Sequence, residues 1–243
     1  MTIYLWEHVH PMPGQIGNYI RGVAERWLPL GDKYDDANRL CGFFVPGVLN
    51  SKQPAVYILW SLGDWDGWRR MLSKPDAEEL LIKTTEFFMP AQQWRSGWTD
   101  KIIEKLPFSP EPPIRPEYMR QGNTVIDHKF VIRPDKCEAF VETMQNDVIP
   151  AAAEIGLHLE LFARVVGRPM EYDAIWSIET QNDYRKWRMS LDVTKIAAAL
   201  PRFEKAWATL VDMEERESSP VWFSPIGGTG VSPHGASATD VAV

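Results

Sequence analysis

The sequence predicts an α+β protein made of two tandem β-α-β-β-α-β repeats whose sheets face each other. One observation is that a strand followed by a proline-punctuated helix occurs twice, at residues 3–19 and 124–140. A second is that Pro13 falls on Pro134, and Tyr19 on Phe140, at the same offset of 121 residues. A third is the proline-dense run PEPPIRPEY at 110–118 between the two series. We therefore interpret the chain as two copies of one unit joined by a linker.

The first repeat is expected over residues 1–110. A strand at 3–10 leads into a helix at 14–28, which Pro29 and Gly31 end. Strands follow near 40–49 and 54–62, and the apolar run of the second fits a central position in a sheet. A short helix after residue 63, a longer one from 76 and an edge strand at 96–106 complete the unit.

The second repeat is expected over residues 123–226, after a linker at 111–122. It comprises a strand at 125–133, a helix at 135–149, strands at 157–166 and 172–178, helices at 180–190 and 194–212, and a strand at 213–222. Trp60-Ser61 recurs as Trp176-Ser177, and Phe-Ser-Pro at 108–110 recurs at 223–225. The small polar residues from 227 to 243 predict a disordered tail. Each sheet would have one face bare of helices, so the two bare faces are expected to pack together and enclose a cavity.

Composition and charge narrow the possible partners. The chain has 243 residues, 44% of them hydrophobic, and a formal charge of -7. This composition is typical of a soluble globular protein, and the negative charge argues against a nucleic-acid partner. The two cysteines imply no disulfide framework, and no signal peptide or membrane-length apolar run is present. We expect a cytoplasmic protein with a small-molecule substrate, no membrane partner and a possible homodimeric state.

The ordered series of motifs resembles the NIPSNAP-like family of the dimeric α+β barrel superfamily, whose unit has the ferredoxin-like plan. The resemblance rests on the Pro-Gly-x-x-x-x-Tyr helix start at 13–19, the strand-end tryptophans and the closing Phe-Ser-Pro runs. It implies a small-molecule cavity between sheets, in a superfamily that includes cofactor-free monooxygenases, isomerases, lyases and haem enzymes. Many relatives carry Arg-x-Tyr in the first strand. Here Glu7-x-Val9 and His128-x-Phe130 stand instead.

Glu7 and His128 are the predicted catalytic residues. They fall on each other at the offset of 121, and each stands among apolar neighbours on its strand face. Burial raises a carboxyl pKa and lowers an imidazole pKa, which brings both groups toward neutrality and suits proton transfer. Across a pseudo-twofold axis they are expected to approach one another. The alternative is that each satisfies a nearby backbone group or an arginine beneath the helices.

The opposite strand faces carry His8, Asp127 and Lys129. Strand parity does not decide which face the helices cover, so these three side chains would line the cavity and bind substrate if the faces are reversed. His8 and His10 have a spacing that is seen in metal sites, but no third ligand has a recognisable spacing. We therefore predict no metal.

Trp60, Trp176 and Phe130 are predicted to wall a pocket for an aromatic ligand, or else to pack the repeated fold. The predicted function is cofactor-independent catabolism of a small aromatic or apolar metabolite by proton transfer, as a lyase or isomerase. A cofactor-free monooxygenase of an aromatic substrate is one alternative. A non-enzymatic small-molecule or partner-binding module is the other. Haem is a further possibility, although no axial ligand can be identified in the sequence.

Overall fold

The computed structural model describes residues 1–34, 39–46, 55–73, 77–114, 120–121, 124–178 and 193–228. The first repeat follows the predicted order of elements. Its strands are β1 (Ile3–Pro11), β2 (Arg39–Pro46), β3 (Val56–Gly63) and β4 (Arg95–Lys105). Its helices are α1 (Ile16–Gly22), α2 (Leu28–Tyr34), α3 (Trp65–Ser73), α4 (Ala77–Lys83) and α5 (Met89–Ala91), with π-helical turns at 23–27 and 84–88.

The second repeat has the same plan. Its strands are β6 (Thr124–Ile132), β7 (His158–Val165), β8 (Glu171–Ile178) and β9 (Leu210–Pro220). Its helices are α6 (Cys137–Thr143), α7 (Ile149–Glu154) and α9 (Val193–Trp207), with a π-helical turn at 144–148. The π-helical turns at 23–27 and 144–148 lie 121 residues apart. The same local departure from α-helical geometry therefore occurs at equivalent positions in the two repeats. Two short strands, β5 (Arg120–Gln121) and β10 (Ile226–Gly227), pair in parallel outside the barrel.

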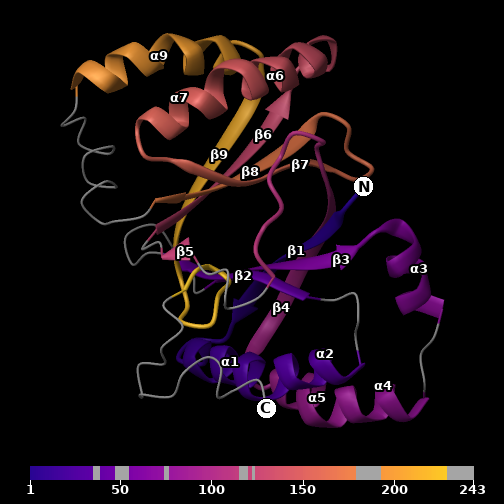
Figure 1. Cartoon of the computed structure of the whole chain (residues 1–243). Coiled ribbons are helices and arrows are strands. Elements are labelled where there is room, and N and C mark those ends of the chain that lie inside the picture. Colours follow the sequence, from indigo (N-terminus) through magenta and orange to yellow (C-terminus); the bar gives the residue numbers. More distant parts are fainter. Residues whose placement is uncertain are drawn as a thin grey trace.

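Eight antiparallel strands close into a barrel in the order β1-β3-β2-β9-β6-β8-β7-β4. Each repeat supplies four neighbouring strands, and the two sheets join at β2 with β9 and at β4 with β7. One layer of helices covers the first sheet from outside and another covers the second sheet, with the barrel between them (Figure 1). The predicted fold class is confirmed. The prediction of an edge strand at 96–106 is wrong in one respect, because β4 pairs with both β1 and β7.

Apolar side chains gather in three clusters. The middle one lies inside the barrel and combines residues of both repeats, among them Trp6, Phe44, Ile103, Leu161 and Ile175. The other two lie between each sheet and its own helices. The barrel therefore has a packed interior that belongs to both repeats. The helices of each outer layer belong to one repeat, and apolar residues from the end of the other repeat pack into that layer.

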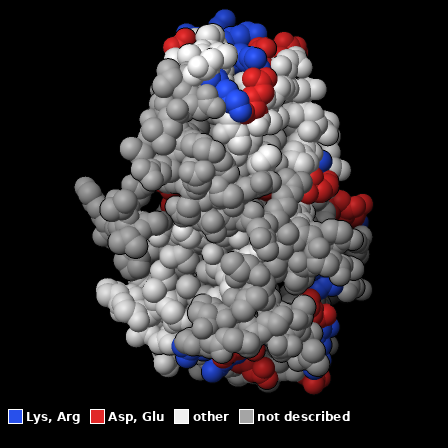
Figure 2. Space-filling view, turned by 60° about the vertical axis from the view of Figure 1, so that its left-hand side comes forward, with Lys and Arg blue, Asp and Glu red and all other residues white. Residues whose placement is uncertain are grey.

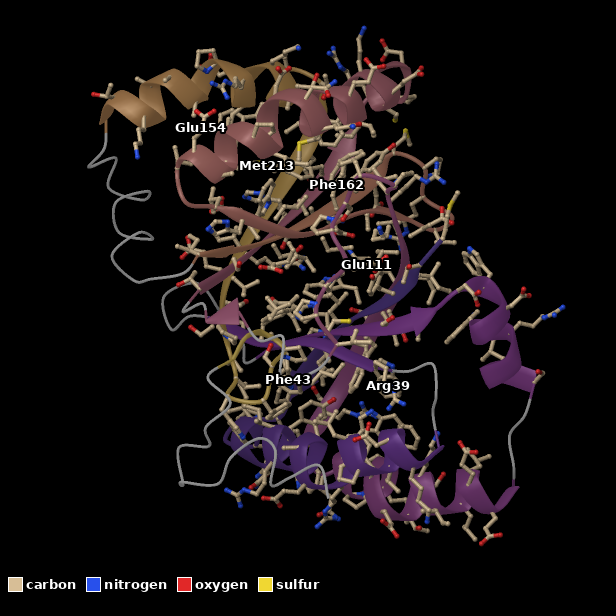
Figure 3. All side chains as sticks on the ribbon, in the orientation of Figure 1. Arg39, Phe43, Glu111, Glu154, Phe162 and Met213 are labelled. Carbon is tan, nitrogen blue, oxygen red and sulfur yellow. The ribbon has the colours of Figure 1, made fainter. Side chains whose placement is uncertain are left out.

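The Phe-Ser-Pro runs explain how each repeat is fastened to the other. The Ser224 hydroxyl accepts a hydrogen bond from the backbone N–H of Phe43 at 3.0 Å and donates to the carbonyl of Ile226 at 2.7 Å. The Ser109 hydroxyl accepts from the N–H of Phe162 at 2.7 Å. Phe43 and Phe162 lie in opposite sheets (Figure 3). The end of each repeat is thus bound to a strand of the other.

Several predicted boundaries shift. The helix predicted at 194–212 ends at Trp207 and continues through Pro201, and the last strand begins at Leu210. The predicted helix at 180–190 and the predicted tail beyond residue 228 lie outside the described residues. No helix within the described ranges has the length and hydropathy needed to cross a membrane. On the face shown in Figure 2, acidic and basic side chains are intermixed at the two helical ends.

Candidate functional site

His128 and Glu215 form a hydrogen-bonded pair on the helix-facing side of the second sheet. They lie directly opposite each other on β6 and β9, so their side chains emerge side by side. His128 Nε2 lies 2.8 Å from Glu215 Oε2. An ionised carboxylate can only accept a hydrogen bond, so the ring nitrogen that faces it carries the proton. In a neutral imidazole the other ring nitrogen carries a lone pair, which is what a general base requires.

The pair lines a cavity of about 130 Å³, the sheet–helix pocket, which lies between strands β6, β8 and β9 on one side and the π-helical turn at 144–148 and helix α9 on the other. Met213, on the β9 wall, lies beneath this helical layer (Figure 3). The walls are largely apolar: Phe130, Met144, Val148, Phe203, Trp207 and Met213. Met144 and Val148 belong to the π-helical turn at 144–148. The volume is close to the roughly 150 Å³ at which an apolar protein cavity binds benzene. The pocket therefore suits a single ring.

Trp176 supplies an unsatisfied donor in the same wall. Its side chain is 2% exposed, and its Nε1 finds no acceptor within the described parts of the chain. The His128 and Trp176 rings meet edge to face, with centroids 6.5 Å apart. A buried N–H without an acceptor costs about 1–3 kcal/mol. A ligand that carries an oxygen atom would recover that free energy.

The corresponding place in the first repeat has different chemistry. Trp60 Nε1 donates to Glu7 Oε2 at 2.5 Å, so this indole N–H is satisfied by the side chain that replaces histidine. Burial raises the pKa of Glu7, although the Trp60 hydrogen bond and Arg95 oppose the shift. Opposite Glu7 on β4 stands Asp100. In the first repeat a glutamate thus stands opposite an aspartate, whereas in the second repeat His128 stands opposite Glu215.

The structure does not bring the two predicted catalytic residues together. Glu7 and His128 both lie on the helix-facing sides of their sheets, on opposite sides of the barrel, rather than facing each other across it. Trp60, Trp176 and Phe130 lie on these outer faces as well. The reversed assignment that the sequence left open is the one the structure has. His8, Asp127 and Lys129 lie on the inner faces.

The barrel interior holds a buried network of charges. Lys101 on β4 binds Asp173 on β8 at 2.7 Å, and Arg216 on β9 binds Asp127 on β6 at 3.4 Å. Burial raises the pKa of Asp127 to about 6; Asp173 adds to the shift, and Lys101 and Arg216 oppose it. Burial also raises the pKa of Asp173. The two carboxyl groups therefore resist being ionised together.

His8 lies at the side of this network. Burial, together with the neighbouring His10 and Arg216, lowers the pKa of His8 to about 4. The imidazole is neutral near pH 7 and packs on Tyr57, with ring centroids 4.6 Å apart. Among the described residues, no group of three or more His, Cys, Asp and Glu side chains could hold a metal ion.

Glu215 is the site residue that the sequence reasoning missed. The sequence does contain a signal for Glu215. The Phe-Ser-Pro runs are 115 residues apart, and at the same offset Glu215 aligns with another acidic residue, Asp100. The partner of His128 can be found only when strand register is known, and register comes from the whole sheet. The haem alternative does not fit this arrangement. The pocket is well below the roughly 300–1,000 Å³ of sites for drug-sized ligands.

Fold and packing together define the class: the chain has the dimeric α+β barrel fold, with both halves of the barrel in one polypeptide. Solved structures share this arrangement along most of their length. A candidate monooxygenase from Fusobacterium nucleatum subsp. nucleatum superposes with a TM-score of 0.62 at 10% identity, covering 90% of this chain and 92% of its own. A candidate monooxygenase from Lactobacillus acidophilus gives 0.59 at 12% identity, covering 90% and 93%.

A third structure, of an anthrone oxidase-like protein, gives a TM-score of 0.58 at 10% identity, with 90% of this chain and 91% of that chain covered. At such identities the similarity shows the fold alone. No family model matches the sequence, and no curated protein matches it.

Proposed function

We propose that the chain is an enzyme that removes a proton from a small oxygen-bearing ring compound held in the sheet–helix pocket. The observation that carries the proposal is the position of the His128–Glu215 pair in the wall that also contains the unsatisfied Trp176 N–H. A base and a hydrogen-bond donor in one apolar cavity are what enolate or phenolate formation needs.

The step follows from the two groups. The free ring nitrogen of His128 takes the substrate proton, and Glu215 holds the ring and stabilises the imidazolium that results. The electron pair left by that proton moves onto the substrate oxygen. Trp176 Nε1–H donates to this oxygen as its negative charge develops. Return of the proton to another carbon gives an isomerase, and loss of a leaving group from the anion gives a lyase.

A second candidate is cofactor-free oxygenation, which the names of the structurally similar proteins favour. The same anion would react with dioxygen, so that a CH₂ group becomes a carbonyl and one molecule of water is released. Both candidates share the His128 step, and only the second consumes oxygen. The finer NIPSNAP-like assignment and the homodimeric state remain part of this proposal. The sequence motifs quoted above support the NIPSNAP-like assignment. Gel filtration would report whether the chain is a monomer or a homodimer.

The substrate class can be tested by thermal shift with phenol, 2-cyclohexenone and toluene. A ligand at 100 times its Kd adds about 2.7 kcal/mol of stability, which is several degrees in a chain of this size. We expect the two oxygen-bearing rings to raise the Tm more than toluene does. Equal shifts for all three would contradict a role for the Trp176 N–H in binding.

Proton removal can be followed without knowing the product. Proton NMR in D₂O reports exchange of the 2-cyclohexenone C–H groups next to the conjugated carbonyl system. We expect exchange with the native chain and a rate lower by about 100-fold or more in His128→Gln. Trp176→Phe should lose about 100-fold in rate, while the matched Trp60→Phe keeps the native rate. Oxygen consumption, measured with an oxygen electrode, distinguishes the oxygenase from the isomerase or lyase, because only the oxygenase consumes oxygen. Binding with no exchange in any variant would identify a binding module instead.

A further inference from the structure

A polar cavity of about 200 Å³ opens at one end of the barrel, on the inner faces of the strands. Trp6 and His8 come to it from β1 and Lys101 from β4, while Lys129 and Arg216 come from β6 and β9. We call it the barrel-mouth cavity. It is separate from the sheet–helix pocket, because His8 and Lys129 project to the other side of their strands from Glu7 and His128.

The wall contains a second buried donor without an acceptor. Trp6 is 3% exposed, and its Nε1 has no hydrogen-bond partner among the residues that the structure describes. The indole is held in place by Tyr57, which stacks on it with centroids 6.2 Å apart, and by Phe44 at 6.1 Å. An indole N–H can only donate, so whatever satisfies Trp6 must offer an acceptor atom.

Cationic side chains line the same cavity as Trp6, and their carboxylate partners fix them in place. Lys101 is held by Asp173 at 2.7 Å, while Lys129 and Arg168 share Glu171 at 3.7 and 3.3 Å. Arg216 is held by Asp127 and Glu214. Each lysine ammonium has three N–H donors, and one carboxylate contact does not exhaust them.

Acidic groups also reach the wall and limit what can bind. Glu171 is engaged by the two cations just named, and Asp100 is exposed at the rim. His8 adds no positive charge, since its pKa is lowered to about 4. The lining therefore carries four cations against two carboxylates, with a neutral indole N–H among the donors. Asp127, Asp173 and Glu214 pair with these cations, so net charge alone does not select an anion. The selection comes from the donors, because the Trp6 N–H and the remaining lysine N–H groups need acceptor atoms, which a small anion offers and a cation or an apolar ring does not.

We propose that the barrel-mouth cavity binds a short-chain carboxylate, with Trp6 Nε1 and Lys101 Nζ as donors to its two oxygens. The charged end lies among Lys101, Lys129 and Arg216, and the short hydrocarbon end contacts the Trp6 and His8 rings. A cavity of about 200 Å³ has room for an acid of a few carbon atoms.

The test is a titration of ¹⁵N-labelled native chain with sodium propionate, at ionic strength kept constant with sodium chloride. The Trp6 indole resonance, assigned by its loss in Trp6→Phe, should move with a saturable curve. The Trp176 indole resonance should not move. Propionamide, which has the same size but no charge, should leave Trp6 unchanged. A linear drift of all indole signals, or an equal response to propionamide, would overturn the proposal.

Two variants localise the anion and keep the test decisive if Trp6→Phe does not fold. Lys129→Met removes a partly exposed cation of the wall and should weaken propionate binding about tenfold. Lys136→Met removes an exposed lysine outside the cavity and should leave binding unchanged. Equal Kd values in both variants would refute the location. Tighter binding of inorganic phosphate than of propionate would refute the carboxylate class.

Discussion

A single exchange of residue type between the repeats changes the hydrogen bonds in the wall of the sheet–helix pocket. Glu7 and His128 occupy the same position in the repeated unit, and Trp60 and Trp176 are likewise equivalent. With glutamate present, the indole N–H has an acceptor. With histidine present, the imidazole contacts Glu215 and the indole N–H has no acceptor among the described residues. His128 could be selected from the sequence because it is a lone titratable group on an apolar face.

Asp127 gives a prediction on pH dependence. Its pKa is raised to about 6 in the folded chain, above the roughly 3.9 of an unfolded one. Protonated Asp127 therefore stabilises the fold at low pH, and this contribution is lost as pH rises through 6. Asp127→Asn stays neutral at every pH. We expect the variant to gain about 1 kcal/mol relative to the native chain between pH 5 and pH 7.5.

Urea unfolding at the two pH values measures this change. Glu171→Gln is a control, because its carboxylate contacts Lys129 and Arg168 at the rim of the cavity. A difference between native chain and Asp127→Asn that does not vary with pH would contradict the shifted pKa.

At the scale of elements, the strands and the starts of the first helices were predictable because their apolar residues follow the strand and helix periods. The predicted end of the first helix at Pro29 and Gly31 is wrong, because α2 continues through both to Tyr34. Which face of each strand points into the barrel could not be predicted. Along β1, Leu5 and Val9 look as suited to a core as Tyr4 and Trp6 do, and both faces are in fact covered. Only the pairing of β4 with β7 and of β2 with β9 shows that the aromatic face turns inward.

The Phe-Ser-Pro runs give a prediction about these joints. Ser224→Ala leaves the buried N–H of Phe43 without its acceptor, so we expect a loss of about 1–3 kcal/mol in the free energy of unfolding. Ser109→Ala should have a similar cost through Phe162. Ser96→Ala removes an exposed bond to the His10 carbonyl and should change little. Chemical denaturation measures all three. Losses of equal size in Ser96→Ala and Ser224→Ala would show that the two joints carry no special stability.

For the whole molecule, duplication was the strongest signal in the sequence, because offsets of 115–121 recur along the chain. The location of the pocket was not predictable from it. Two bare sheet faces suggested a central cavity. Trp6, Phe44, Tyr57 and other large side chains fill much of the barrel, which leaves the polar barrel-mouth cavity at one end but no apolar space at the centre of the described barrel. Space for a ring compound is left instead under the helices of one repeat.

The shared interior predicts cooperative unfolding of the two repeats. Ile103 is fully buried among residues of both halves, and Ile103→Ala should cost about 2–5 kcal/mol. We expect tryptophan fluorescence and far-UV circular dichroism to show one coincident transition in the native chain and in the variant. Two separate transitions, with only one shifted by the substitution, would mean that the repeats fold independently.

The predicted linker contacts a buried side chain of the barrel. Glu111 (labelled in Figure 3) is largely exposed, and it accepts a hydrogen bond from the hydroxyl of the buried Tyr4 at 2.5 Å. Burial and this bond to Glu111 raise the pKa of Tyr4.

The Glu7–Trp60 bond also has a consequence for stoichiometry. A dimer of two identical subunits would present the same indole donor twice and take up two equivalents of an oxygen-bearing ring. In this chain one of the two donors is permanently occupied by an internal carboxylate. Calorimetric titration with phenol should therefore saturate at one molecule per polypeptide. In Glu7→Ala, where Trp60 loses its acceptor, a second and weaker binding event should appear.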